Sequence, residues 1–500
     1  MNATPEPSPS PVSRGEIALY LVVCLAFLGV NLVTSSRSPV VWQDEVMFAD
    51  PAVNLATGRG FTTSAWFQPR TTFFAGNSPL HSLCLAPWVK TFGVNAVAVR
   101  SLNYVFVLAA LAVTCLALAR LGLVNSPANR LLLVALVLCA DGVTYSYRGG
   151  RYDCLGMLAI AGMLWALTLP TPRDRTAVLV GLAALVPWAG LQLIPYAALL
   201  GLLLLVVKGR AAVGGVASVA VGGALGTAAL VGLFRAEGVW PEFVKSVALL
   251  GGARRPLAAR AADALRAPLA EPSSLLLLLA LAVLLGFELR RGGLRLRSPV
   301  VVGLLAGVVV PCALAFVGKY VRYYAWMSSV PTAVCVASYL GGAGATTAAR
   351  LAVAPLLLLA CAVGLPARLA VTALEWGLRD PAPVDRLVAG RVRPGDWVFS
   401  EYEAYYPAKR TAAALFLPPY LGDTSGPPLA DPPITAAERD RVNVLITKPD
   451  TAAKRLAFFG GPWTPVARYA ADPAARVRLL AKVGFGSKPY DLTVYRRRGR

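Results

Sequence analysis

Two adjacent carboxylates, Asp44 and Glu45, stand in the stretch VVWQDEVMFAD (residues 40–50), which follows the first long apolar run of the chain. Acidic residues are scarce: there are 26, and 13 of them fall in residues 371–500, so the first 370 residues hold the other 13. A carboxylate shielded by hydrophobic side chains and close to cations can stay ionised and accept a proton from a hydroxyl group. We therefore expect a general base here, and the simpler alternative is a solvated pair at a helix N-terminus.

Cationic residues gather in two later stretches, YRGGRYD (147–153) and KYVRYY (319–324). A guanidinium group binds a phosphate as a bidentate fork, and an ammonium group binds it as a point charge. The alternatives are a salt-bridged turn for the first stretch and an aromatic belt with snorkelling cations for the second. The candidate residues are Arg148, Arg151, Asp153, Lys319, Arg322 and Tyr323.

The chain has a single histidine, His81, and eight cysteines, none of them in a CxxC pair. This composition argues against a Cys/His metal site and leaves no Ser-His-Asp triad except one built around His81. We therefore expect no metal site and no cofactor, although nothing in the sequence excludes a divalent metal. His81 either has a structural role or binds substrate. Asp141 lies inside an apolar run, where a carboxylate either has a functional role or forms a hydrogen bond to a neighbouring helix.

The elements that must position these residues are membrane-spanning helices. The mean hydropathy is +0.60, and 56% of the residues are hydrophobic. A membrane-spanning helix needs roughly 20 apolar residues, and the chain contains many runs of about this length. The net charge of +22 suits cytoplasmic loops and lipid headgroups, and no nucleic-acid-binding motif accompanies it, so we expect no nucleic-acid partner. Eleven apolar runs are predicted to be helices: 17–34, 96–119, 130–147, 152–169, 176–191, 192–207, 211–234, 273–289, 299–317, 323–341 and 350–366.

The two runs within 176–207 are the least regular, because Pro187 and Pro195 either break this stretch into two helices or interrupt one. With two helices there, and with the most basic short loops in the cytoplasm, the N-terminus is cytoplasmic. The outer face then carries the polar stretches described above. The segments predicted to lie outside are 35–95, 147–153, 235–272, 318–322 and everything after about 367.

The predicted fold is therefore an all-α polytopic membrane protein of about eleven helices, followed by a small extracytoplasmic α/β domain. The last 130 residues hold half of the carboxylates and three β-like segments, DWVFS (396–400), NVLIT (443–447) and DLTVY (491–495). The predicted boundaries are 1–15 for a disordered cytoplasmic N-terminus, 16–366 for the transmembrane domain including the outer loop 35–95, and 367–500 for the α/β domain.

The outer loop 35–95 is rich in aromatic residues and is punctuated by glycine and proline. Such residues suit the headgroup level of a membrane, so part of the loop is expected to be an interfacial helix that roofs a cavity open to lipid. The aromatic residues concerned are Trp66, Phe67, Phe73, Phe74 and Trp88.

Several motifs carry a family resemblance that spans roughly residues 15–340. The acidic pair in WQDEVMFADPAVNLATGRGF resembles the start of the GT-C superfamily of membrane glycosyltransferases, in the bacterial branch of protein mannosyltransferases and lipid A aminoarabinose transferases. The stretches NSPLHSLCLAPWVKTFGVNAVAVRSLNYV, SYRGGRYDCLG and GKYVRYYAWMSSVP are similar to its later motifs. This chain departs from the family at Leu80-His81, where an aromatic residue or a second proline is frequent.

The resemblance implies transfer of a sugar from a polyprenyl phosphate to an extracytoplasmic glycan, lipid or protein, with inversion. It implies Asp44 as the catalytic base with Glu45 beside it, and it places Arg148, Arg151 and Asp153 around the donor or acceptor, with Asp153 as a third candidate catalytic carboxylate. Lys319 and Arg322 would hold the lipid phosphate. Such a reaction needs cations for the leaving phosphate and a carboxylate for the acceptor proton, contributions worth about 10²–10⁴ in rate each.

Two other functions compete with this interpretation. A transporter or flippase of a lipid-linked saccharide should place its polar residues near the bilayer midplane, yet here all except Asp141 are predicted at one face. A non-catalytic scaffold would leave the polar clusters unexplained. Arginine outnumbers lysine 39 to 9, which suits a GC-rich bacterium, so we expect the bacterial inner membrane with the active site on its outer face.

Overall fold

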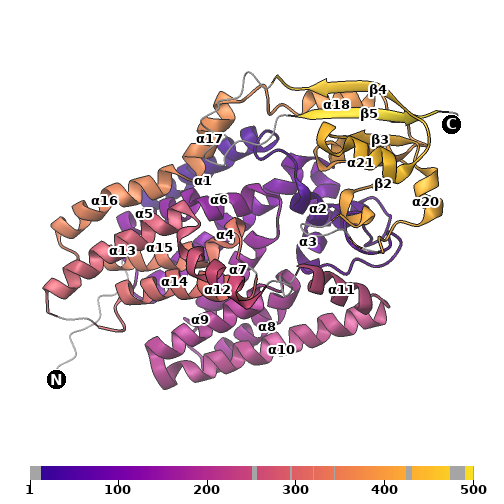
Figure 1. Cartoon of the computed structure of the whole chain (residues 1–500). Helices are drawn as coiled ribbons and strands as arrows, with labels where there is room; N and C mark the ends of the chain where they lie inside the picture. The colour runs from indigo at the N-terminus through magenta and orange to yellow at the C-terminus, as the bar shows by residue number, and fades with distance from the viewer. Residues whose placement is uncertain are drawn as a thin grey trace.

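The computed structural model describes residues 13–250, 256–292, 295–318, 320–342, 344–423, 429, 431–472 and 490–498. Within them, a large helical region is followed by a small sheet with its own helices, and the sheet lies at one end of the molecule (Figure 1). This arrangement confirms the predicted fold class of a helical membrane domain with a C-terminal α/β unit.

Most of the apolar runs form the helical region. Serine or threonine side chains cap the N-termini of several of these helices, as Ser13, Ser126 and Thr171 do, because the first backbone N–H groups of a helix otherwise lack acceptors. The helices are α1 (Arg14–Ser35), α4 (Ala96–Arg120), α5 (Pro127–Cys139), α6 (Asp141–Arg148), α7 (Asp153–Ala166), α8 (Pro172–Ala189), α9 (Leu193–Lys208), α10 (Val213–Ala236), α13 (Pro272–Arg290), α14 (Pro299–Phe316), α15 (Trp326–Gly341), α16 (Thr347–Ala362) and α17 (Leu365–Leu374).

The number of membrane spans differs from the prediction. Each of the eleven predicted runs coincides with a helix or with a bent helix pair. Among the described residues, five helices are long and apolar enough to cross a membrane, or up to seven if the bent pairs α5–α6 and α16–α17 each count as one span. Eleven spans are therefore not confirmed. The stretch 176–207 does form two helices, since α8 ends at Ala189 and α9 begins at Leu193.

Shorter helices lie outside this region. In the outer loop they are α2 (Gln43–Ala56) and α3 (Pro79–Phe92), and between α10 and α13 they are α11 (Trp240–Leu250) and α12 (Leu257–Arg266). Short 3₁₀ turns occur at η1 (Gly209–Ala212), η2 (Ala267–Leu269) and η3 (Arg322–Tyr324). In Figure 1, α2 and α3 lie between the sheet and the helical region.

The C-terminal unit contains a five-stranded mixed sheet with strand order β2-β1-β3-β5-β4. β1 is parallel to β2 and β3, whereas β5 is antiparallel to β3 and β4. The three predicted β-like segments are β1, β3 and β5. The elements are α18 (Ala382–Ala389), β1 (Trp397–Ser400), η4 (Tyr402–Ala404), α19 (Tyr405–Thr411), β2 (Ala414–Phe416), η5 (Pro418–Leu421), α20 (Ala436–Arg441), β3 (Val444–Thr447), α21 (Pro449–Phe459), β4 (Trp463–Ala470) and β5 (Asp491–Arg497).

The outer loop and the C-terminal unit share one hydrophobic core. Residues of α2 and α3 pack in the same cluster as Val398 of β1, Tyr405 of α19 and Val444 of β3. Trp66, Phe67 and Phe74 are buried in this cluster, so protein covers these side chains, and their position at the headgroup level stays a prediction. Burying large aromatic side chains is strongly favourable, and here a folded unit covers them instead of lipid. The predicted domain boundaries remain predictions, and α17 runs across the one at residue 366/367.

Candidate functional site

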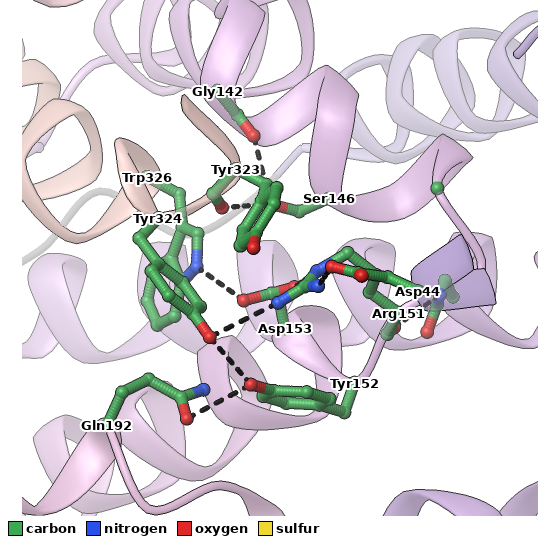
Figure 2. Close-up of polar contacts among 12 residues, drawn as sticks. Asp44, Gly142, Ser146, Arg151, Tyr152, Asp153, Gln192, Tyr323, Tyr324 and Trp326 are labelled. Carbon is green, nitrogen blue, oxygen red and sulfur yellow. Dashed lines mark hydrogen bonds and ion pairs between the residues drawn. The ribbon is translucent and has the colours of Figure 1, made fainter. Parts of the chain in front are cut away.

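Asp44, Arg151 and Asp153 form one ionic group, here named the carboxylate–arginine site. Arg151 Nε donates to Asp153 Oδ2 at 2.8 Å, and its Nη1 is ion-paired with Asp44 Oδ2 (Figure 2). Asp44 lies in the first turn of α2, Asp153 begins α7, and Arg151 belongs to the connection between α6 and α7. The structure thus brings together three residues that the sequence placed on the same face.

The backbone beside Arg151 requires glycine. Gly150 has a φ of 64°, a left-handed conformation that glycine adopts without steric cost. A Cβ atom at this position would lie 2.6 Å from Glu45 Cγ. Gly150 therefore lets the connection turn tightly against α2, and this turn delivers Arg151 to Asp44.

Aromatic residues surround the guanidinium group of Arg151. It lies 3.6 Å from the ring centroid of Tyr323, and its Nη2 donates to Tyr324 Oη at 3.3 Å. Trp326 Nε1 donates to the second oxygen of Asp153 at 3.4 Å. A guanidinium group held over a ring face gains cation–π attraction, so two carboxylates and the tyrosine rings of η3 fix Arg151, while Trp326 of α15 holds Asp153.

The two neighbouring carboxylates have different environments. The Asp44 side chain is 20% exposed, and its Oδ1 has no hydrogen-bond partner among the described residues. Glu45 is fully buried, where Arg100 Nη2 contacts its Oε2 at 2.5 Å and Tyr406 Oη donates to its Oε1 at 2.7 Å. Burial raises the pKa of Glu45, and the charge of Arg100 opposes this shift. Asp44 is therefore the accessible carboxylate of the pair.

A second buried ion pair ties α2 to the C-terminal unit. Lys409 Nζ contacts Asp50 Oδ1 at 2.5 Å, and Tyr405 Oη donates to the same oxygen at 2.9 Å. Burial alone would raise the pKa of Asp50, but Lys409 and the hydrogen bonds of Ser64 N and Thr63 hold it below its usual value. α19 thus contacts α2 through both Glu45 and Asp50.

Arg148 lies apart from the carboxylate–arginine site. Its guanidinium group donates to Asn31 Oδ1 at 2.6 Å, to Thr34 Oγ1 at 2.9 Å and to the backbone oxygen of Ser38 at 2.9 Å. It is almost completely buried. Arg148 therefore links α6 to α1, and its described partners are uncharged.

Arg322 belongs to another cluster of ionic residues. Arg322 Nε donates to Asp141 Oδ2 at 2.6 Å, and Arg368 Nη2 donates to Asp141 Oδ1 at 3.0 Å. Asp141 stands at the 63° break between α5 and α6. The Tyr145 ring lies against both guanidinium groups and 6.2 Å from the Tyr323 ring, which connects this cluster to Arg151. Lys319, the other predicted phosphate ligand, lies outside the described residues.

His81 is buried in the first turn of α3. Burial and the nearby positive charge of Arg151 lower its pKa to about 3, so the imidazole is neutral at physiological pH. Neither ring nitrogen has a hydrogen-bond partner among the described residues. The only histidine of the chain therefore lies close to the carboxylate–arginine site.

An apolar cavity of about 1180 Å³ opens within the helical region. Its walls come mainly from α4, α7, α8, α9, α10, α14 and α15. Trp326 and Tyr196 line it, and their rings contact each other at 5.4 Å between centroids. Because the indole N–H of Trp326 reaches Asp153, this side chain joins the apolar cavity to the carboxylate–arginine site.

Several residues of the site escaped the sequence analysis. Tyr406 and Lys409 lie in the C-terminal unit, and Arg100 and Arg368 lie near the ends of apolar runs. The one available signal was the position of Asp141 in an apolar run, which calls for a cationic partner. Among the described residues, no group of three or more His, Cys, Asp or Glu side chains could hold a metal ion.

The fold and site thus define a helical integral membrane protein with a buried carboxylate–arginine centre beside an apolar cavity. No protein-family model and no curated protein matches the sequence. The structure is similar to ArnT from Cupriavidus metallidurans bound to undecaprenyl phosphate, with a TM-score of 0.49 and 13% identity over 97% of this chain and 98% of that one.

A second solved protein is also similar to this chain. Arabinofuranosyltransferase AftD from Mycobacteria, in a mutant form, gives a TM-score of 0.48 and 15% identity over 98% of this chain and 42% of its own. At identities and scores this low, neither similarity assigns the chain to a family.

Proposed function

We propose that the chain is a membrane glycosyltransferase of the GT-C type, which transfers a hexosyl or pentosyl group from a polyprenyl-phosphate donor to an extracytoplasmic acceptor. The observation that carries the proposal is the junction at Trp326, which lines the apolar cavity and donates a hydrogen bond to Asp153. A lipid chain suits the cavity, because its walls are apolar, and its polar end then lies beside the carboxylate–arginine site.

Asp44 is the proposed catalytic base. It is the partly exposed carboxylate of the site, whereas Glu45 and Asp153 are fully buried in ion pairs. Asp44 takes the proton of the acceptor hydroxyl as that oxygen bonds to the anomeric carbon. The bond from this carbon to the phosphate oxygen breaks, and the phosphate leaves with the electron pair. Attack from the face opposite the phosphate inverts the anomeric carbon.

The surrounding cations have two proposed roles, to position Asp44 and to stabilise the leaving phosphate. Arg151 already binds two carboxylates and is almost completely buried, so it positions Asp44. Arg322 is 29% exposed and precedes Trp326, at the cavity wall, by about one helical turn. We assign Arg322, with Lys319 and Arg368, to the leaving phosphate, whose developing charge a guanidinium group stabilises well.

The test uses the full-length protein in liposomes with a radiolabelled polyprenyl-phosphate sugar and acceptor-containing membranes. Asp44→Asn should lower the transfer rate about 10²–10⁴-fold, the usual worth of a general base. Asp385→Asn is the matched control, since Asp385 is 46% exposed and lies in the C-terminal unit. Transfer by Asp44→Asn at the wild-type rate would remove Asp44 from catalysis.

One observation favours the alternative, a transporter or flippase of a lipid-linked saccharide. The helix break at Asp141, with Arg322 and Arg368 bound to it, is the kind of interrupted helix that transporters use for binding. The same liposomes separate the two functions. Movement of the labelled lipid between leaflets without formation of a glycosylated product would establish the alternative. The proposed site of action is the outer face of a bacterial plasma membrane.

A further inference from the structure

Buried polar atoms without partners gather beside the carboxylate–arginine site. Five such atoms of the described residues belong to four side chains: Asn77 Oδ1, Ser78 Oγ, His81 Nδ1 and Nε2, and Gln192 Nε2. We name these four residues the amide–imidazole cluster. Buried polar groups nearly always have hydrogen-bond partners, and leaving one unpaired costs folding free energy. These unpaired atoms therefore do not contribute to the stability of the fold.

Two of the four side chains, Asn77 and Gln192, meet at one phenol oxygen, that of Tyr152. Tyr152 Oη accepts a hydrogen bond from Asn77 Nδ2 at 3.3 Å. It donates to Gln192 Oε1 at 3.1 Å (Figure 2). Ser78 directly follows Asn77 and precedes α3, and His81 lies three residues later in the first turn of that helix, a spacing that places Ser78 and His81 on one side of the helix end. Two segments far apart in sequence, the start of α3 and the α8–α9 connection, thus lie against each other, and Leu191 N also donates to the backbone oxygen of Asn77 at 3.3 Å.

Two local features of the backbone accompany these unpaired groups, one at Ser78 and one at Gly190. Serine at a helix N-terminus usually accepts a backbone N–H, yet Ser78, the residue before α3, makes no such hydrogen bond. At Gly190, a Cβ atom would lie 2.7 Å from Gln192 Nε2 and 2.9 Å from Tyr152 Cε2. A larger residue at position 190 would displace both side chains.

The cluster is connected to the proposed reacting groups. Tyr152 Oη lies 2.7 Å from Tyr324 Oη, which accepts a hydrogen bond from Arg151 Nη2. Arg151 in turn holds Asp44. Tyr152, Tyr324 and Arg151 therefore connect a group bound at the cluster to the proposed base, Asp44.

The chemistry of the free atoms is mixed and uncharged. Asn77 Oδ1 accepts, Gln192 Nε2 donates, and Ser78 and a neutral His81 each do both. Hydroxyl groups need this mixture, because each donates one hydrogen bond and accepts others. An ammonium group would need a carboxylate, and the cluster contains none, while the positive charge of Arg151 acts on His81.

We propose that the amide–imidazole cluster binds the hydroxyl groups of an uncharged glycosyl residue and so selects a neutral sugar over an amino sugar. This inference rests on the proposed function for the identity of the ligand as a lipid-linked sugar. It assigns Gln192 and Asn77 as specificity-determining residues, in addition to Asp44 and the cations.

Binding tests the inference without requiring turnover. The purified full-length protein is titrated with three short-chain prenyl phosphates: one without a sugar, one with a neutral pentose, and one with an amino pentose in which an ammonium group replaces a hydroxyl. Wild type should bind the neutral sugar lipid at least about 10-fold more tightly than the other two. Equal affinities for the first two lipids, or preference for the amino sugar, would overturn the inference.

Variants locate the effect at the cluster. Gln192→Leu should lose about 10-fold or more of the affinity for the neutral sugar lipid and keep that for the sugar-free lipid. Gln192→Glu, which has nearly the same shape, should shift preference towards the amino sugar and guards against a simple folding defect. Gln68→Leu is the matched control, because Gln68 is a buried glutamine outside the cluster, between α2 and α3, whose side-chain amide is bonded to Phe73 O and Ala75 N. It should leave the ratio of affinities unchanged.

The outcomes also separate this inference from the proposed function. If the protein binds the sugar-bearing lipid preferentially but transfers no sugar, the proposed glycosyltransferase activity is refuted and the sugar-binding role of the cluster stands. If it transfers sugar and both Gln192 variants keep the wild-type sugar preference, the sugar-binding role of the cluster is refuted and the proposed activity stands.

Discussion

Tyr406 of the C-terminal unit donates a hydrogen bond of 2.7 Å to Glu45 of α2, 361 residues earlier in the chain. Glu45 also binds Arg100 of α4, so this carboxylate joins the outer loop, the helical region and the C-terminal unit. Its neighbour Asp44 faces Arg151 instead. Consecutive residues of a helix point about 100° apart, which explains how one acidic pair serves two purposes.

Asp44→Asn and Glu45→Gln should therefore differ in what they damage. Glu45→Gln leaves the buried Arg100 without its counter-ion and should lower the free energy of unfolding by about 3–5 kcal/mol. Asp44→Asn leaves Arg151 paired with Asp153, so it should lower stability less than Glu45→Gln does, while the transfer rate falls about 10²–10⁴-fold. Thermal unfolding in detergent and the liposome transfer assay measure the two effects. Equal loss of stability in both variants would contradict this division of roles.

The contact between Lys409 and Asp50 should contribute strongly to stability. Lys409→Met leaves a buried carboxylate unpaired and should cost about 3–5 kcal/mol. Lys454 forms the control pair, because it lies 2.6 Å from Asp423 and is 61% exposed; Lys454→Met should cost less than about 1 kcal/mol. Since the pKa of Asp50 is held below its usual value, the pair stabilises the fold above about pH 4 and this contribution disappears on acidification below it. Chemical unfolding at pH 7 compares the two variants.

The sequence was sufficient for the helical elements and for the grouping of Asp44 with Arg151 and Asp153. Long apolar runs identify buried or membrane helices through composition alone, and charged residues at their ends are conspicuous because few are present. The C-terminal strands β1, β3 and β5 were also recognisable from their β-branched and aromatic residues. β2 has three residues and β4 contains Pro465, so neither carries a clear strand pattern.

Contacts between distant segments could not be predicted. Nothing local distinguishes Tyr406 and Lys409 from surface residues of a polar domain, and only the three-dimensional structure shows that α19 meets α2. The same reason explains why the burial of Trp66 and Phe74 against the C-terminal unit was not predicted. Aromatic residues in an outer loop have the same composition whether lipid or a folded unit covers them.

His81 should make stability depend on pH in a range where few other groups titrate. Its pKa is about 3 in the folded protein and about 6.5 when unfolded. Between these values the unfolded chain binds a proton that the folded chain does not, so stability is complete above about pH 6.5 and falls on acidification, by up to about 1.4 kcal/mol per pH unit. Midpoints of thermal unfolding from pH 7.5 to 5 should decline less steeply in His81→Gln than in wild type. Parallel curves would show that folding does not lower the pKa of His81.

The packing of α10 against α8 should tolerate no side chain at two glycines. A Cβ atom at Gly226 would lie 2.0 Å from the backbone oxygen of Ala184, and one at Gly222 would lie 2.3 Å from that of Val180. Small residues four apart let helix backbones approach closely in membranes, and Trp188 Nε1 donates to the Gly226 oxygen at 3.0 Å across this contact.

Gly226→Val should therefore separate the two helices and lower stability by about 1–3 kcal/mol or more. Gly232→Val is the control in the same helix, since a Cβ atom there would meet nothing within 4 Å. Because α8 ends at Ala189 and leads directly to Gln192, its displacement should also weaken binding of the sugar-bearing lipid more than that of the sugar-free lipid. Thermal unfolding measures the loss of stability, and the lipid titrations measure the change in affinity. Equal stability and equal affinities in Gly226→Val and Gly232→Val would show that neither depends on the close contact between α8 and α10.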